Sequence, residues 1–288
     1  MRYGLALPTG GECGDPRFLL DLAVLAEENG WDGVFLEDYV FYQGDPARPT
    51  TNTWTALAAM AVRTSSIVLG VEVVALTRRR PWNVAREAAA VDQLSKGRLV
   101  LGVGIGDQGD PGYTHLGEET DTRIRAGILD EGLQIVAGLW TGEPFSFHGA
   151  HFTIEEVTFR PTPVQRPRPP IWIGGGYPNP RAIDRSLRWD GTCMYRRAGG
   201  PLLAEDVRDL RARAGERRWD IAVGGWERRD DALGLALSES GWDSRTLCYP
   251  ALIRRGDDVL MFYNGNDMGL DGFGVALTHD PVLGGMHD

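Results

Sequence analysis

The feature that most constrains the fold of this chain is an alternation of short apolar runs with segments of helical periodicity over its first 230 or so residues. Apolar runs of this length are typical of strands buried on both faces, as in parallel sheets covered by helices. Seven such runs fit a closed α/β barrel better than an open sheet of five or six strands. The predicted strands are residues 2–8, 33–36, 67–74, 98–104, 170–174, 190–195 and 219–225.

The helical segments between these strands begin and end at recognisable signals. Asp15 and Pro16 start the first helix, and Asn29 and Gly30 end it. Such residues cap helices because they satisfy backbone groups that have no partner within the helix. The predicted helices cover residues 16–29, 52–63, 81–96, 122–140, 180–188 and 204–214.

Two segments depart from this rhythm. Residues 143–170 are aromatic and then proline-rich, which predicts a hairpin followed by an extended stretch. Residues 245–280 predict an antiparallel meander of two or three strands, packed near an open sheet edge or paired with a second chain. We therefore expect two domains, a barrel over 1–231 and a β-rich tail over 232–288.

Composition excludes several classes of function. A net charge of −10 argues against nucleic acid or an anionic membrane as a partner. The three cysteines are far apart without a C-x-x-C pair, which suits a reducing compartment and predicts no metal site. The first residues lack the apolar segment of a signal peptide, and no apolar run approaches the roughly 18 residues of a membrane span. A cytoplasmic location is expected.

Reactive groups of such a barrel lie at the carboxyl ends of its strands. Glu37 and Asp38 end the second strand and are candidates for general acid–base catalysis. Adjacent residues on a strand point to opposite faces, so at most one of them faces the centre. His115, in a loop after the fourth strand, is the third catalytic candidate, although histidines of this kind are more often surface residues.

Glycines mark two further strand ends. Residues 104–109 satisfy G-x-G-x-x-G, but no helix follows at once, so a dinucleotide site is disfavoured against a sharp loop or the close approach of a flat ring. Gly174–Gly176 precede a helix, and their N–H groups are expected to cradle a phosphate. The basic run Arg78–Arg80 indicates a solvated loop or an anion contact. The candidate cofactor-binding residues are Val74, Ala75, Gly104, Asp107, Gly174, Gly175, Gly176, Tyr177, Tyr195 and Trp226.

Four stretches, in order along residues 1–231, closely resemble the luciferase-like monooxygenase family, the bacterial luciferase superfamily. They are W-D-G-V-F-L-E-D-Y (31–39), R-P-W-N-V-A-R-E-A-A-A-V-D-Q-L-S-K-G-R-L-V-L-G-V-G-I-G (80–106), D-E-G-L-Q-I-V-A-G-L-W-T-G-E-P-F-S-F-H-G (130–149) and R-P-T-P-V-Q-R-P-R-P-P-I-W-I-G-G (160–175). The resemblance implies a TIM-barrel-like (β/α)8 fold with reduced FMN or the deazaflavin coenzyme F420 at its carboxyl mouth.

The resemblance also implies roles for individual positions. Val73–Leu76 matches a strand end that often contains a non-proline cis peptide beneath the isoalloxazine ring. Gly174–Tyr177 matches a loop that helps to hold the phosphate, and Asp38 or its neighbour matches an acid near the ring. Residues 143–160 match an insertion after the fourth helix.

One departure concerns the end of the chain. The family continues with a helix, an eighth strand and a final helix, whereas the tail here is similar to a terminal blade of five-bladed β-propeller glycosidases. The barrel is therefore predicted to be incomplete after strand seven. The expected activity is that of a flavin-dependent oxidoreductase or monooxygenase on a small organic substrate, with a homodimer left open. A non-catalytic fold remnant or fusion product, and a carbohydrate-active protein, remain as alternatives.

Overall fold

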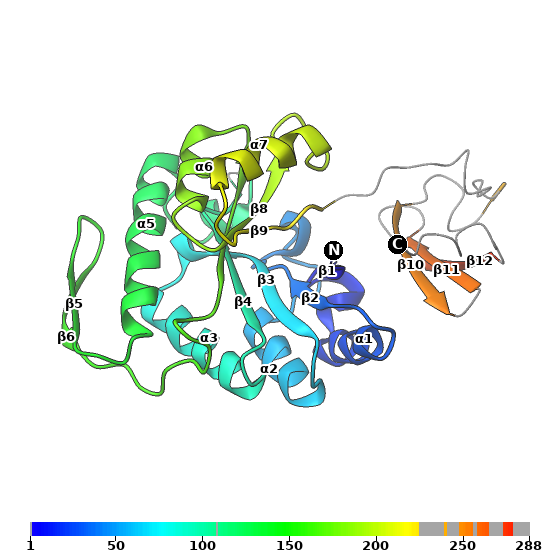
Figure 1. The fold of residues 1–288 in the computed structure, drawn as a ribbon, viewed down its shortest axis with the longest axis horizontal. Helices are drawn as coiled ribbons and strands as arrows, with labels where there is room; N and C mark the ends of the chain where they lie inside the picture. Colours follow the sequence, from blue (N-terminus) through cyan, green and yellow to red (C-terminus); the bar gives the residue numbers. More distant parts are fainter. Residues whose placement is uncertain are drawn as a thin grey trace. The chain divides into compact units, whose positions relative to one another are not determined.

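The computed structural model of the protein describes residues 2–107, 109–224, 239–240, 248–255, 258–264 and 273–278. The chain divides into two compact units, Met1–Gly224 and Gly225–Asp288 (Figure 1). The first unit is an α/β structure, and the strands described in the second are antiparallel. The predicted domain boundary at residue 231 lies outside the described residues.

The described residues of the first unit contain a seven-stranded sheet in which every pair of neighbours is parallel and the order follows the chain. This confirms the predicted parallel sheet. Its strands are β1 (Gly4–Leu7), β2 (Gly33–Leu36), β3 (Val68–Ala75), β4 (Leu99–Gly104), β7 (Ile171–Tyr177), β8 (Gly191–Arg196) and β9 (Asp220–Ile221).

The sheet curls, so that its first and last strands approach one another. Arg2, just before β1, forms an ion pair of 3.6 Å with Asp220 of β9. No hydrogen-bonded pairing joins β1 to β9 among the described residues. The sheet is therefore a barrel-like layer with an open seam, as predicted for a barrel incomplete after its seventh strand.

All six predicted helices are present: α1 (Pro16–Glu28), α2 (Thr53–Arg63), α3 (Pro81–Leu94), α5 (Thr122–Leu139), α6 (Pro180–Ser186) and α7 (Ala204–Ala214). Capping side chains fix several starts, since Asp15, Asn52 and Asp121 each accept a backbone N–H of the first turn. Short helical segments that the sequence did not predict are η1 (Gly11–Gly14), η2 (Tyr42–Gly44), η3 (Leu76–Arg78) and α4 (Pro111–Thr114). No described helix is both long and apolar enough to cross a membrane.

The main core lies between the convex face of the sheet and its helices. Outward-facing strand residues such as Leu36, Leu69 and Leu101 are fully buried there against α1, α2, α3 and α5. A second, smaller core joins α6 and α7 to β8 around Ile183, Met194 and Leu210. The concave face is thus left to form the site.

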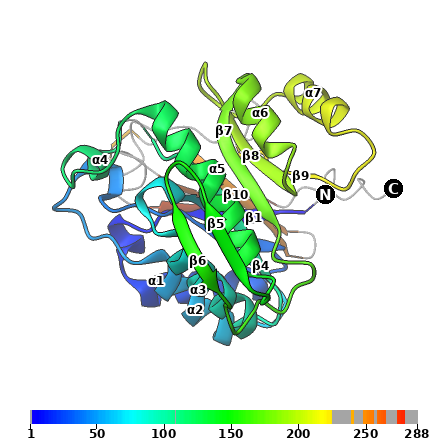
Figure 2. The ribbon, with the colours of Figure 1, turned by 90° about the vertical axis from the view of Figure 1, so that its left-hand side faces the viewer.

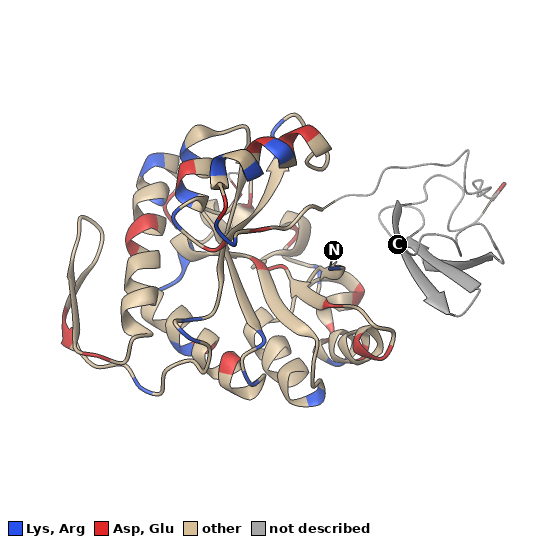
Figure 3. Ribbon diagram, viewed as in Figure 1, with Lys and Arg blue, Asp and Glu red and all other residues tan. Residues whose placement is uncertain are grey.

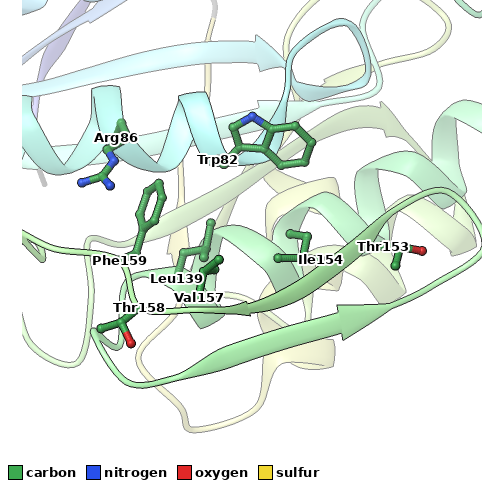
Figure 4. A pocket seen from close by; sticks show the side chains of 8 residues that line it. All are labelled: Trp82, Arg86, Leu139, Thr153, Ile154, Val157, Thr158 and Phe159. Atoms are coloured by element: carbon green, nitrogen blue, oxygen red, sulfur yellow. The ribbon is translucent and has the colours of Figure 1, made fainter.

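The predicted hairpin is present as β5 (Phe145–His148) and β6 (Thr153–Val157), which lie along α5 (Figure 2). Glu131 of α5 accepts the backbone N–H groups of residues 150–152 at 2.7–3.0 Å. Hairpin, α3 and α5 line an open pocket of about 420 Å³ (Figure 4). Its lining residues are Trp82, Arg86, Leu139, Thr153, Ile154, Val157, Thr158 and Phe159.

A buried carboxylate anchors the proline-rich segment that follows the hairpin. Asp92 of α3 is fully buried and accepts Val164 N at 2.6 Å and Gln165 N at 3.1 Å. Gln165 Nε2 donates to Asp92 at 2.7 Å and to the carbonyl of Leu99, at the amino end of β4, at 2.8 Å. The segment is therefore held against the end of the sheet opposite to the mouth.

The second unit contains an antiparallel sheet of β10 (Cys248–Arg255), β11 (Asp258–Asn264) and β12 (Phe273–Thr278) among its described residues. This confirms the predicted meander. Its expected packing near the open seam or against a second chain, and its likeness to a propeller blade, stay predictions.

We predict that Asp92→Ala lowers the free energy of unfolding by about 3 kcal/mol, because the N–H groups of residues 164 and 165 lose a buried acceptor. Urea denaturation measures the loss. Asp21→Ala, which removes an exposed carboxylate from α1, is the control and should change stability by less than about 0.5 kcal/mol. Equal effects of the two substitutions would contradict an anchoring role for Asp92.

Candidate active site

Two aromatic rings form the floor of the concave face. Phe35 of β2 stacks on Trp172 of β7 with 5.3 Å between ring centroids and 16° between planes. The strands beside them carry glycine, since a Cβ on Gly70 would collide with the Phe35 ring and one on Gly191 would lie 2.6 Å from the Trp172 ring. The next residues along the strands therefore form the surface above this floor.

Glu37 and Glu72 lie side by side in that next layer. The β2–β3 register pairs Leu36 with Val71, so the following residues of the two parallel strands are neighbours. Both side chains are half-buried, and in the described part of the chain neither carboxylate has a hydrogen bond or an ion pair. Burial raises the pKa of both to about 7, and the charge of Glu72 contributes to the shift at Glu37. The pair therefore holds a proton near neutral pH.

Glu37 was a predicted catalytic residue, whereas Glu72 was missed. The signal was in the sequence, because Glu72 is the only charged residue in the apolar run I-V-L-G-V-E-V-V. A lone carboxylate in a buried strand costs free energy unless it is paired or functional. Figure 3 shows how unusual it is, since the strands of the first unit are mostly uncharged.

Asp38, the adjacent predicted acid, is committed to an ion pair. It is 7% exposed and accepts two hydrogen bonds from Arg79, at 2.6 and 2.9 Å, and one from Thr53 at 3.2 Å. This arrangement favours a structural role over that of a free base. Arg78 bonds the Asp110 carboxylate and the Asp38 carbonyl.

The basic run is therefore neither a solvated loop nor a set of free anion ligands. Arg78 and Arg79 are drawn inward by the carboxylates of Asp110 and Asp38. Arg80 alone of the three is exposed, and its guanidinium lies 5.8 Å from the Trp82 ring.

A saddle at the mouth is formed by Val73 between Gly104 and Gly174. A Cβ on Gly104 would lie 3.2 Å, and one on Gly174 2.9 Å, from the methyl groups of Val73. A non-proline cis peptide joins Glu72 to Val73, one residue before the predicted stretch. The sequence singled out Val74 and Ala75, but both are buried, with Val74 in the main core. Val73 faces the mouth instead of these two residues, because the β3–β4 register shifts between Val71 and Val74.

The triple glycine does not form the expected loop before a helix. Gly174–Gly176 continue β7 and pair with residues 193–195 of β8. Gly175 points away from the saddle, since its Cβ would lie 2.9 Å from Ala182 of α6. Gly176 lies against the side chain of Arg197. The expected loop is wrong because pairing with β8 extends the strand to Tyr177, ahead of a helix that starts at Pro180, whereas the phosphate contact expected of these glycines stays a prediction.

The remaining candidates are dispersed. Asp107 is exposed and accepts Gly109 N at 3.0 Å within its own loop. His115 ends α4, exposed, with its ring 6.4 Å from that of Phe41. Tyr177 donates its hydroxyl to Asp209 at 2.9 Å, and Tyr195 is 62% exposed. Trp226 lies outside the described residues.

Comparison with known proteins gives the family. The profile of the luciferase-like monooxygenase family matches residues 1–224, and the chain belongs to this family. An F420-dependent glucose-6-phosphate dehydrogenase of Microbacterium testaceum is 34% identical over 167 residues, covering 57% of this chain and 48% of that protein. The match thus spans about half the length of this curated relative.

Solved structures share the fold. An F420-dependent secondary alcohol dehydrogenase in complex with an F420–acetone adduct superposes with a TM-score of 0.65 at 19% identity, covering 76% of this chain and 67% of that one. The oxygenating constituent of 3,6-diketocamphane monooxygenase from Pseudomonas putida, in complex with FMN, superposes with a TM-score of 0.59 at 20% identity. The match covers 75% of this chain and 63% of that one.

We predict that Asp38→Ala lowers the free energy of unfolding by about 2–3 kcal/mol, because the partly buried Arg79 loses both of its hydrogen bonds to a carboxylate and keeps only a longer ion pair of 3.7 Å with Glu87. Removing Arg79 as well should recover part of the loss. Urea denaturation of both variants and of Asp184→Ala, an exposed acid on α6, checks this. A loss no larger than that of Asp184→Ala would be incompatible with the ion pair.

The raised pKa of Glu72 predicts a pH effect on stability. The folded state binds more protons than the unfolded one between the ordinary pKa of 4.5 and the folded pKa of about 7, so stability falls as pH rises through this window. Glu72→Gln should abolish its share of the fall. Its melting temperature should match wild type at pH 4 and exceed it at pH 8 by roughly 2–4 °C for each pKa unit relieved. Glu155→Gln on the exposed face of β6 should follow wild type at both pH values. Parallel curves for wild type and Glu72→Gln would exclude the raised pKa.

Proposed function

We propose that the chain is an oxidoreductase that binds F420 or FMN at the carboxyl mouth of its sheet. The observation that carries the proposal is the saddle of Val73 between Gly104 and Gly174, which offers a flat ring an apolar support without side chains on either flank. Family membership and the names of its relatives support the same reading.

Different residues of the chain would bind the cofactor and handle the proton. Val73, Gly104 and Gly174 would support the ring, and Arg197, exposed beside Gly176, would meet the phosphate. The bound cofactor would supply hydride transfer or the activation of oxygen. Glu37 and Glu72 would hold a proton beside the reacting atoms, since carboxyl groups with a pKa near the working pH serve as general acids and bases.

The names of the relatives specify two different cofactors. The curated relative is named for F420, whereas a solved relative carries FMN. We favour F420, because the F420-dependent relative is the more similar in sequence, at 34% identity against 20%. A carbohydrate-active protein is not favoured, since the proteins compared above are oxidoreductases. A homodimer stays a prediction.

Gly104→Leu is expected to weaken cofactor binding by about tenfold or more, because the added side chain occupies the space above Val73. Fluorescence titrations of F420 and of FMN into the full chain measure this. Ala90→Leu adds the same bulk to an exposed position of α3 and should bind like wild type. Circular dichroism melts confirm that both variants fold. Binding of neither cofactor by wild type, or equal binding by Gly104→Leu, would reject the site.

A further inference from the structure

We propose that Glu37 and Glu72 restrict the substrate of this mouth to neutral or cationic molecules and exclude phosphate esters. The inference rests on the proposed function, since it concerns the substrate side of the same site. It is carried by the distribution of paired and unpaired charges around the concave face.

The side of the mouth formed by β2 and β3 carries negative charge without a counter-charge. Glu37 and Glu72 have no cationic partner in the part of the chain that the structure describes. Three other titratable groups face them: Cys13, Tyr39 and Cys193. Burial, followed by nearby carboxylate charge, raises the pKa of Cys13 to about 11, that of Tyr39 to about 12, and that of Cys193 as well. All three are neutral at physiological pH, so none offsets the glutamates.

The cations nearest to this side are already engaged. Arg78 and Arg79 are paired with Asp110 and Asp38. Arg125 is 1% exposed, donates to the carbonyls of Ile105 and Asp107, and stacks 3.9 Å from the Tyr113 ring. The only lysine of the sequence, Lys96, precedes β4 and lies at the opposite end of the strands. Arg80, the remaining arginine of the run after β3, is exposed and lies 5.8 Å from the ring of Trp82, which packs on Phe152 of the hairpin. A phosphate beside the glutamates would therefore meet repulsion, and among the described residues no free arginine or lysine lies on the concave face beside them.

The side formed by β7 and β8 has the opposite character. Arg197 follows β8, is exposed, and has no side-chain ion pair among the described residues. Three strand spacings of about 4.8 Å separate β3 from β8, or roughly 14 Å across the sheet. An anionic cofactor would thus place its phosphate by Arg197 and its ring over Val73. The substrate would be left with the glutamates.

This selectivity would separate the chain from the relative whose name specifies glucose 6-phosphate. A substrate that carries a phosphate needs cations to replace its hydration, and on the β2–β3 side Arg78 and Arg79 are already paired with Asp110 and Asp38. A neutral alcohol or carbonyl compound, or an amine, avoids this cost. A protonated amine would in addition gain a charge contact with Glu37 or Glu72.

The test compares two probes of the same shape, benzylamine and benzyl phosphate, on the full chain loaded with whichever cofactor it binds. Isothermal titration at pH 8 should give tighter binding of benzylamine by about tenfold or more, because one charge contact in a partly desolvated site has that effect. The double variant Glu37→Gln/Glu72→Gln should lose this preference. Glu155→Gln/Glu156→Gln removes the same number of charges from exposed positions of β6 and should keep it.

Each outcome decides the proposal. A preference for benzyl phosphate, binding of neither probe, or a preference for benzylamine that survives in the Glu37→Gln/Glu72→Gln variant would overturn it. Melting curves establish that the variants are folded. The cofactor titration is a separate measurement, so failure of the proposed function appears there. If no cofactor binds, the two probes are titrated into the cofactor-free chain. The same preference for benzylamine over benzyl phosphate then supports the proposal, and its absence overturns it.

Discussion

The stack of Phe35 on Trp172 is the contact on which the architecture of the site depends. In a parallel barrel the interior is filled by layers of side chains from alternate strands. Here two rings from β2 and β7 fill the lower layer across the concave face, at 5.3 Å. They can meet because β3 and β8 carry glycine beside them. Glu37, Glu72 and the saddle at Val73 therefore lie above this filled layer, at the carboxyl ends of the strands.

Local signals made much of the fold predictable. Helix starts depend on capping side chains within a few residues, such as Asp15, Asn52 and Asp121. Strand order followed because consecutive βαβ units connect neighbouring parallel strands with one handedness, which leaves few arrangements. The hairpin at β5 and β6 was visible for the same reason, since its aromatic strands and its turn lie next to one another in sequence.

The site was less predictable because its geometry depends on contacts that are distant in sequence. Asp38 looked like a free acid until Arg79, 41 residues away, was found paired with it. The register shift in β3 turns Val73, instead of Val74, toward the mouth, and no residue type signals that shift. The glycines at 174–176 indicated a loop by composition, but pairing with β8 decided their conformation. Glu72 was the exception, because its position in an apolar strand was already informative.

The anchoring of the hairpin has a consequence for how such a protein can diversify. Glu131 on α5 fixes the backbone at the turn between β5 and β6, and Asp92 on α3 fixes the proline-rich segment that follows the hairpin. Gln165 ties its exit to the amino end of β4, remote from the mouth. The pocket beneath the hairpin is lined by helix and insertion residues and by none from the parallel strands. The hairpin positions that face solvent, such as Glu155 and Glu156, are therefore exchangeable at little cost to the sheet, whereas Phe152 is part of the main core. Evolution or protein engineering can change the surface of the hairpin at these positions, while the residues at the carboxyl ends of the strands stay the same.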